Sequence, residues 1–445
     1  ECGVEDADVD ELYRALEWLL ARQERIEATL AARHLREGGL ALYDLSSSSY
    51  EGTTCVLARR GYNRDGEKLP CIAYGMLTNQ QGCPVAVEVF PGNTGDPTTV
   101  PVQVERLQQR FKLQRVVLVG DRGMLTSTRI EALRAHPGLG WIAALRGPAI
   151  RALVESGAIQ RSLFDERNLA EITAPAYPGE RLIVCFNPRL AEDRQRTRTA
   201  LVEATERELE AIARMAARRT RTPLSDAELG VRVGRVINHY KVAKHFDIEI
   251  DHGVLRVQRR QEAIEQEAAL DGIYVIRTSE PQPTLAAPEV VRGYKCLTTV
   301  ERAFRCLKGM DLRVRPIYLR VENHVRAHVL LCMLAYYVEW HMRQALAPLL
   351  FHDETLPGER ATRDPVAPAK VSAQARIKKA RRTDDAGLAL HSFATLLQDL
   401  ATLCRNTCRL LTQPEAPTFD QLTEPTPLHR RALELLRAVP MYPHR

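Results

Sequence analysis

Three acidic residues stand at positions from which their carboxylates can act together. Asp44 ends a short predicted strand, Asp121 follows a continuous apolar strand, and Glu301 lies in a predicted helix. Polar side chains at strand ends of an α/β sheet can converge on one ligand. Carboxylates are natural ligands of Mg²⁺, and phosphoryl transfer at DNA uses two divalent cations, one at the attacking oxygen and one at the leaving oxygen. The pattern therefore predicts a catalytic metal site at Asp44, Asp121 and Glu301.

Each of these residues also has a purely structural interpretation. Asp44 could cap a turn formed by the serines at 46–49, and Asp121 could be a turn residue ahead of Gly123. Glu301 could be one charge on a solvated helix face. Because the chain has 56 acidic residues, position alone does not choose between the two interpretations.

The surroundings of Glu301 favour the catalytic interpretation. Tyr294, Glu301 and Lys308 recur at intervals of seven residues, which places them on nearly the same face of a helix. The segment resembles the Tyr-x2-Arg-x3-Glu-x6-Lys signature of insertion-sequence transposases in the IS-four-like superfamily. Leu297 stands where the signature has Arg. Arg305, four residues after Glu301 on the same face, is the candidate replacement.

Other segments resemble the same superfamily. Residues 43–48 are similar to its first-aspartate region, and residues 84–96 and 119–124 to the blocks around its second aspartate. The resemblance extends over roughly residues 39–345. It implies a ribonuclease-H-like α/β fold, a mixed sheet with flanking helices, that carries a large mixed α+β insertion between the second catalytic Asp and the catalytic Glu.

The resemblance also implies a reaction and its partners. The enzyme would nick DNA at the terminal inverted repeats of a transposon and transfer the freed 3′-hydroxyl into target DNA, with two Mg²⁺ or Mn²⁺ ions held by the three carboxylates. Family behaviour suggests a homodimer on paired ends. The residues expected to contact DNA are Tyr294, Arg305, Lys308, Arg313 and Arg315.

Two alternatives remain open at this point. One is a nuclease of the same fold that cuts DNA without strand transfer, and the other is an inactive DNA-binding remnant. The complete set of carboxylates argues against the remnant. Terminal inverted repeats beside the coding region would separate a transposase from a nuclease.

The elements that must position these residues follow an α/β pattern. Strands are predicted over 41–45, 72–77, 84–90, 115–119 and 141–145, and helices over 97–111 and 126–135. After a long interval come a strand over 272–276 and helices over 286–308 and 321–348, with a last helical stretch near 388–411.

The interval between Asp121 and Glu301 differs in composition, because residues 149–270 combine short strands with long, charged helices. The absence of an initiating methionine agrees with a missing N-terminal region. The predicted divisions are a helical linker from that region (1–38), the first part of the catalytic core (39–148), an insertion domain (149–270), the second part of the core (271–350) and a basic, partly helical tail (351–445).

Composition sets weaker limits. The net charge of +6 is compatible with a polyanionic partner without requiring one. The ten cysteines include no CxxC pair and are interpreted as reduced thiols of a cytoplasmic, nucleoid-associated protein. The longest apolar run, over 329–338, is too short to span a bilayer and predicts a buried helix, so no membrane partner is expected.

Rival motifs are weaker. The serines at 46–49 lack the G-x-S-x-G pattern of a nucleophile elbow and are predicted to form a tight turn. His324 and His328 have the spacing of metal ligands on a helix but lack a third ligand in the sequence nearby, which disfavours zinc. No phosphate-binding loop of the G-x4-G-K-[ST] type is present, so nucleotide hydrolysis is not supported.

Overall fold

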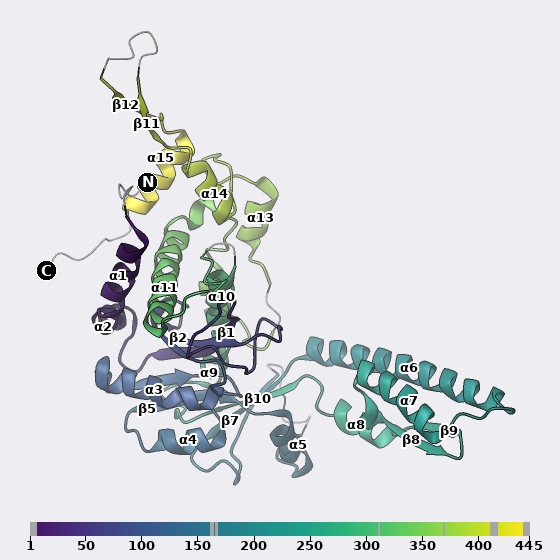
Figure 1. Ribbon diagram of the computed structural model, residues 1–445. Coiled ribbons are helices and arrows are strands. Elements are labelled where there is room, and N and C mark those ends of the chain that lie inside the picture. Colours follow the sequence, from purple (N-terminus) through teal and green to yellow (C-terminus); the bar gives the residue numbers. More distant parts are fainter. Residues whose placement is uncertain are drawn as a thin grey trace. The chain divides into compact units, whose positions relative to one another are not determined.

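The computed structural model describes residues 7–160, 164, 168–309, 312–367, 370–409 and 417–438. The chain divides into two compact units (Figure 1). The first comprises residues 1–143, 278–365 and 369–445, and the second residues 144–277 with 366–368. Among the described helices, none combines the length and apolarity needed to cross a membrane.

The sheet of the first unit has the strand order β3-β2-β1-β4-β5. Strands β1, β2 and β3 pair antiparallel, whereas β1 with β4 and β4 with β5 pair parallel. This mixed sheet with flanking helices is consistent with the expected ribonuclease-H-like fold. Its strands are β1 (Leu40–Ser49), β2 (Cys71–Asn79), β3 (Pro84–Pro91), β4 (Val116–Val119) and β5 (Leu139–Ala144).

Helices of the first unit pack on this sheet through their apolar sides. Helix α10 packs on β1, and α2 and α11 pack on β3 (Figure 1). The helices before residue 144 are α1 (Val9–Leu20), α2 (Gln23–His34), η1 (Asp96–Thr99), α3 (Val100–Glu105), the π-helical turn η2 (Arg106–Arg110) and α4 (Ser127–Arg134). The later ones are α9 (Ala287–Lys295), α10 (Leu297–Lys308), α11 (Glu322–Ala345), η5 (Ala347–Leu349), α12 (Leu356–Thr362), α13 (Ala373–Arg381), α14 (Phe393–Leu400) and α15 (Pro427–Arg437), with a hairpin of β11 (Arg405–Cys408) and β12 (Phe419–Leu422).

The second unit combines three strands in the order β10-β7-β6 with a separate hairpin, β8-β9, that packs on the long helix α6. A buried ion pair between Arg277 and Glu180 stabilises its interior. Two guanidinium nitrogens of Arg277 each donate to one carboxylate oxygen of Glu180 at 2.6 Å. Its described elements are α5 (Gly147–Glu155), β6 (Leu169–Ile172), β7 (Arg181–Phe186), α6 (Pro188–Arg218), α7 (Asp226–Tyr240), η4 (Ala243–His245), β8 (Phe246–Asp251), β9 (Val254–Arg259), α8 (Gln261–Ala268) and β10 (Ile273–Thr278).

The serines at 46–49 extend strand β1, so the predicted tight turn is wrong. They pair with residues 71–74 of β2. Three of their hydroxyls have partners: Ser47 Oγ donates to the Tyr62 carbonyl at 3.2 Å, Ser48 Oγ lies 2.8 Å from the Tyr74 hydroxyl, and Ser49 Oγ donates to Glu67 at 2.5 Å. Serine is tolerated in this buried strand because its hydroxyls are hydrogen-bonded. Asp44 consequently lies within the strand and caps no turn.

Other boundaries also differ from the sequence predictions. The helix predicted over 286–308 is divided at Cys296 into α9 and α10, so Tyr294 and Glu301 belong to different helices. The helical stretch predicted near 388–411 corresponds to α14, which ends at Leu400, and residues 405–408 form a strand. Helix α15 follows at Pro427–Arg437 and was not predicted. Residues 1–6 of the predicted linker, and 410–416 and 439–445 of the predicted tail, lie outside the described residues.

Candidate active site

Strands β1 and β4 bring Asp44 and Asp121 level with each other. The two strands run parallel, and their last paired residues are Leu42 and Val119. Asp44 and Asp121 each follow two residues after that pair, at the carboxyl end of β4. This edge is where polar side chains of an α/β sheet converge.

Asp44 is a half-buried carboxylate that lies near two other acidic residues, Asp121 and Glu301. Its Oδ1 accepts a hydrogen bond from the Leu45 amide at 2.8 Å. The pKa of Asp44 is raised to about 7, mainly by burial and to a smaller extent by the negative charges of Asp121 and Glu301, against the opposing effects of the Leu45 amide and Arg64. The charged form of this side chain is therefore disfavoured in the folded protein.

Asp121 combines a turn with its place at the site. Its Oδ1 accepts hydrogen bonds from the amides of Gly123 at 2.9 Å and Met124 at 2.7 Å. These two bonds fix the carboxylate at the end of β4. A Cβ at Gly123 would lie 3.3 Å from Asp121 Oδ1, so glycine leaves room for this arrangement. The structural and catalytic interpretations of Asp121 are therefore compatible.

Helix α10 presents Glu301 on its exposed side while its apolar side packs on β1. Val300, Ala303 and Phe304 are among its buried residues. Tyr294 on α9 lies close enough to interact electrostatically with the three acidic residues. The pKa of Tyr294 is raised to about 12, mainly by burial and in smaller part by the charges of Asp121, Glu301 and Asp44.

The three carboxylates line one open cavity of about 720 Å³. Arg305, Lys308 and Arg315 line the same cavity, whereas Tyr294 and Arg313 are not among its lining residues. Arg313 is exposed. Sequence analysis missed other residues of this cavity because no motif marks them: Tyr62, Arg64, Asp65 and Phe304. Asp96 also lines it and pairs with Arg64 at 2.6 Å.

Lys308 has partners within the chain, one in strand β1 and one in the loop that connects β1 and β2. Its Nζ donates to the Ser47 carbonyl at 2.5 Å and to Asp65 Oδ1 at 2.9 Å. Arg315 also pairs with Asp65 Oδ1 at 3.0 Å and donates to the Lys308 carbonyl. Burial would raise the pKa of Asp65, but bonds from Lys308 and Ser49 and the two nearby cations hold that pKa below its usual range.

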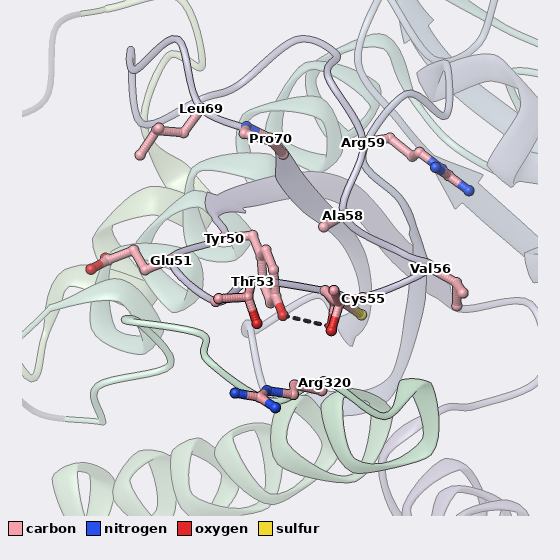
Figure 2. Close-up of a pocket in the computed structure, with 12 residues that line it drawn as sticks. Tyr50, Glu51, Thr53, Cys55, Val56, Ala58, Arg59, Leu69, Pro70 and Arg320 are labelled. Carbon is pink, nitrogen blue, oxygen red and sulfur yellow. Dashed lines mark hydrogen bonds between the residues drawn. The ribbon is translucent and has the colours of Figure 1, made fainter.

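A second, larger cavity of about 920 Å³ lies elsewhere in the first unit (Figure 2). It is formed by the segment that follows β1, where the Tyr50 hydroxyl donates to the Thr54 carbonyl at 3.0 Å. Arg59, Arg320 and Glu51 are its charged lining residues. Size alone does not identify a catalytic site, and Asp44, Asp121 and Glu301 are absent from this lining.

The spacing of His324 and His328 does not correspond to a shared metal site. His324 Nε2 lies 3.1 Å from Glu17, and its ring stacks on Tyr13 with centroids 4.6 Å apart. His328 Nε2 lies 2.9 Å from the Val314 carbonyl. Each ring therefore has its own partner.

Comparison with known proteins gives one family. No curated protein matches the chain. The family described as "Transposase DDE domain" matches residues 44–338, which begin at Asp44 and include Asp121 and Glu301. Since the matched segment is well over half of the chain, the chain belongs to the transposase DDE domain family.

Proposed function

We propose that this transposase cleaves DNA at transposon ends and joins the freed 3′-hydroxyl to target DNA, with Asp44, Asp121 and Glu301 as its catalytic carboxylates. The observation that carries the proposal is the convergence of these three side chains, from β1, β4 and α10, on one open cavity. An open cavity is required because a DNA strand must reach the carboxylates.

The residues present fit a pair of divalent cations. Carboxylate oxygens are the ligands that Mg²⁺ and Mn²⁺ take in proteins. The pKa of Asp44 is raised mainly by burial and also by Asp121 and Glu301, and a bound cation would favour the charged carboxylate against both effects. When bound, two such ions would activate the attacking oxygen and stabilise the leaving oxygen of an in-line displacement. Backbone amides of Gly123 and Met124 hold the Asp121 carboxylate in position for this role.

The basic residues around the cavity divide into two groups. Arg305 is exposed, lies one helical turn beyond Glu301 and has no ion pair among the described residues. We assign it, with the half-exposed Arg315 and the exposed Arg313, to contacts with DNA phosphates. Lys308 and Tyr294 are more buried. We assign Lys308 to shaping the cavity, and we assign Tyr294, which does not line it, to a supporting position near the three carboxylates.

The arrangement of domains is part of the same proposal. Residues 149–270 are an insertion between Asp121 and Glu301 in a ribonuclease-H-like core, and the second compact unit, 144–277, covers that interval. A homodimer on paired ends would bring two such sites to two DNA ends.

Strand transfer is the reaction that tests this proposal against a nuclease. The substrate is a duplex carrying the terminal inverted repeat found beside the coding region, mixed with a supercoiled target plasmid in Mg²⁺ or Mn²⁺. We expect nicked ends and joined plasmid products, both lost with a chelator and with Asp44→Asn. Glu131→Gln, an exposed carboxylate on α4, is the matched control and should behave as wild type. Nicking without joined products would support a nuclease instead.

A further inference from the structure

A second group of potential metal ligands lies in the first unit, apart from the carboxylates. His34 is the last residue of α2, Cys83 precedes β3, and His341 lies on α11. One ligand atom from each residue lies within 4.8 Å of the ligand atoms of the other two. Three elements that are distant in sequence thus bring two imidazoles and one thiol to a single point.

This donor set differs in chemistry from the carboxylate cavity. Nitrogen and sulfur ligands favour Zn²⁺ and related transition-metal ions over Mg²⁺. In a tetrahedral zinc site the ligand atoms are about 3.5 Å apart, given bonds of roughly 2.0–2.3 Å. Small side-chain rotations would close the observed group to that size.

Burial prepares these side chains for a cation. Both imidazoles are partly buried, and each offers a ring nitrogen to the group of three ligand atoms. The Nε2 atom of His341 is buried without a hydrogen-bond partner in the described part of the chain. An unsatisfied buried polar atom is costly, and a coordinated cation would satisfy it.

We propose that His34, Cys83 and His341 bind one Zn²⁺-class cation at a structural site. The Tyr337 hydroxyl, 3.1 Å from His34 Nε2, lies beside the site and can orient the His34 ring or occupy the remaining position. Cys83 is fully buried, and the thiolate is the form in which cysteine binds a metal ion.

A cation bound at the site would link the turn between β2 and β3 to helices α2 and α11, which carry His34 and His341. Trp340, next to His341, donates to the Gln81 carbonyl in this turn at 3.4 Å. On another side, a Cβ at Gly82 would lie 2.7 Å from the Thr299 Cβ on α10, so the turn packs closely against the helix that carries Glu301. A bound cation would therefore support the packing of α2, α11 and α10, whatever reaction the carboxylates catalyse.

Cobalt substitution tests the proposal on the full chain. After dialysis against a chelator, Co²⁺ is added and its absorption recorded. A thiolate–Co²⁺ charge-transfer band together with intense tetrahedral d–d bands should saturate at one equivalent and disappear when Zn²⁺ is added. Oxygen-only sites give no thiolate band, so Asp44→Asn should retain the signal.

The variants identify the ligands. Cys83→Ser should lose the charge-transfer band, and His34→Gln and His341→Gln should lose the tetrahedral spectrum, with circular dichroism used to confirm folding. Cys55→Ser, a half-buried cysteine from the segment after β1, is the control and should keep both. No thiolate band in the wild-type chain, or a band that persists in Cys83→Ser, would overturn the proposal. The wild-type result decides even if a variant fails to fold.

Discussion

Two aspartates of one cavity, Asp44 and Asp65, have opposite electrostatic settings. Asp44 is surrounded by Asp121 and Glu301, and its pKa is raised to about 7. Asp65 is almost fully buried, but Lys308, Arg315 and the Ser49 amide bind it, and its pKa is lowered. The chain itself supplies the positive charge that pairs with Asp65, and no such pair is formed by Asp44 among the described residues. Under the proposed function, the Asp65 arrangement would serve folding, and the Asp44 arrangement would serve metal binding at the expense of stability.

The largest expected difference is in activity. Each of Asp44→Asn, Asp121→Asn and Glu301→Gln should reduce end cleavage on the order of 10³-fold, because a lost metal ligand removes charge stabilisation comparable to that of an oxyanion-hole donor. DNA binding, measured by fluorescence anisotropy, should survive. Cleavage rates on an end-containing duplex provide the measurement, and near-normal cutting by any of these variants would remove that residue from the site.

Asp65→Asn should instead reduce stability. Removing this carboxylate leaves Lys308, whose side chain is 13% exposed, without its charged partner, and breaking a buried pair costs about 3 kcal/mol. Chemical denaturation at pH 7 measures the loss. A paired variant, Asp65→Asn with Lys308→Met, should recover part of it. If Asp65→Asn is as stable as wild type, the contrast between the two aspartates fails.

Asp44→Asn should leave the metal-free protein more stable by about 1–2 kcal/mol at pH 8. The folded-state pKa of Asp44 lies above the unfolded value, so its contribution is most favourable below about pH 4 and is lost as pH rises to about 7. Asp65 has the opposite sign, since its contribution is present above the unfolded pKa and is lost on acidification.

Thermal unfolding from pH 4 to pH 8, with and without Mg²⁺, checks this prediction. Mg²⁺ should stabilise the wild type at pH 8 and stabilise Asp44→Asn much less. Equal stabilisation of both proteins by Mg²⁺ would mean that Asp44 does not contribute to cation binding.

The sequence predicted the acidic residues that are marked by local sequence patterns. Asp121 follows a continuous apolar strand, and Glu301 sits in a helix with a recognisable spacing, so both could be proposed as site residues from the pattern alone. Asp65 could not be, because it lies in an irregular loop, and its partners Ser49, Lys308 and Arg315 are brought together only by the fold.

The same limit explains the incorrect predictions. The serines at 46–49 have low intrinsic preference for strands, but pairing with β2 and hydrogen-bonded hydroxyls override it. The helix over 286–308 has unbroken apolar periodicity, and the interruption at Cys296 leaves no signal in the sequence. Periodicity predicts which side of an element is buried more reliably than where the element ends.

The smallest expected effect separates two of the basic residues that line the cavity, Arg305 and Lys308. Binding of Lys or Arg to DNA phosphate releases counterions, and each lost contact reduces the slope of log K against log salt by about one unit. Arg305→Ala should show that change, because Arg305 is exposed and close to Glu301. Lys308→Ala should change the slope less, since Asp65 already neutralises the lysine within the folded chain. Its effect should appear as lower stability and a uniformly weaker affinity.

Anisotropy titrations of an end duplex at several salt concentrations measure both slopes, and Lys308→Met controls for the lost aliphatic stem. A full one-unit change in Lys308→Ala, with no change in Arg305→Ala, would show that Lys308 leaves Asp65 to bind phosphate. The side of the cavity where Asp65 pairs with Lys308 and Arg315 would then be part of the DNA-binding surface.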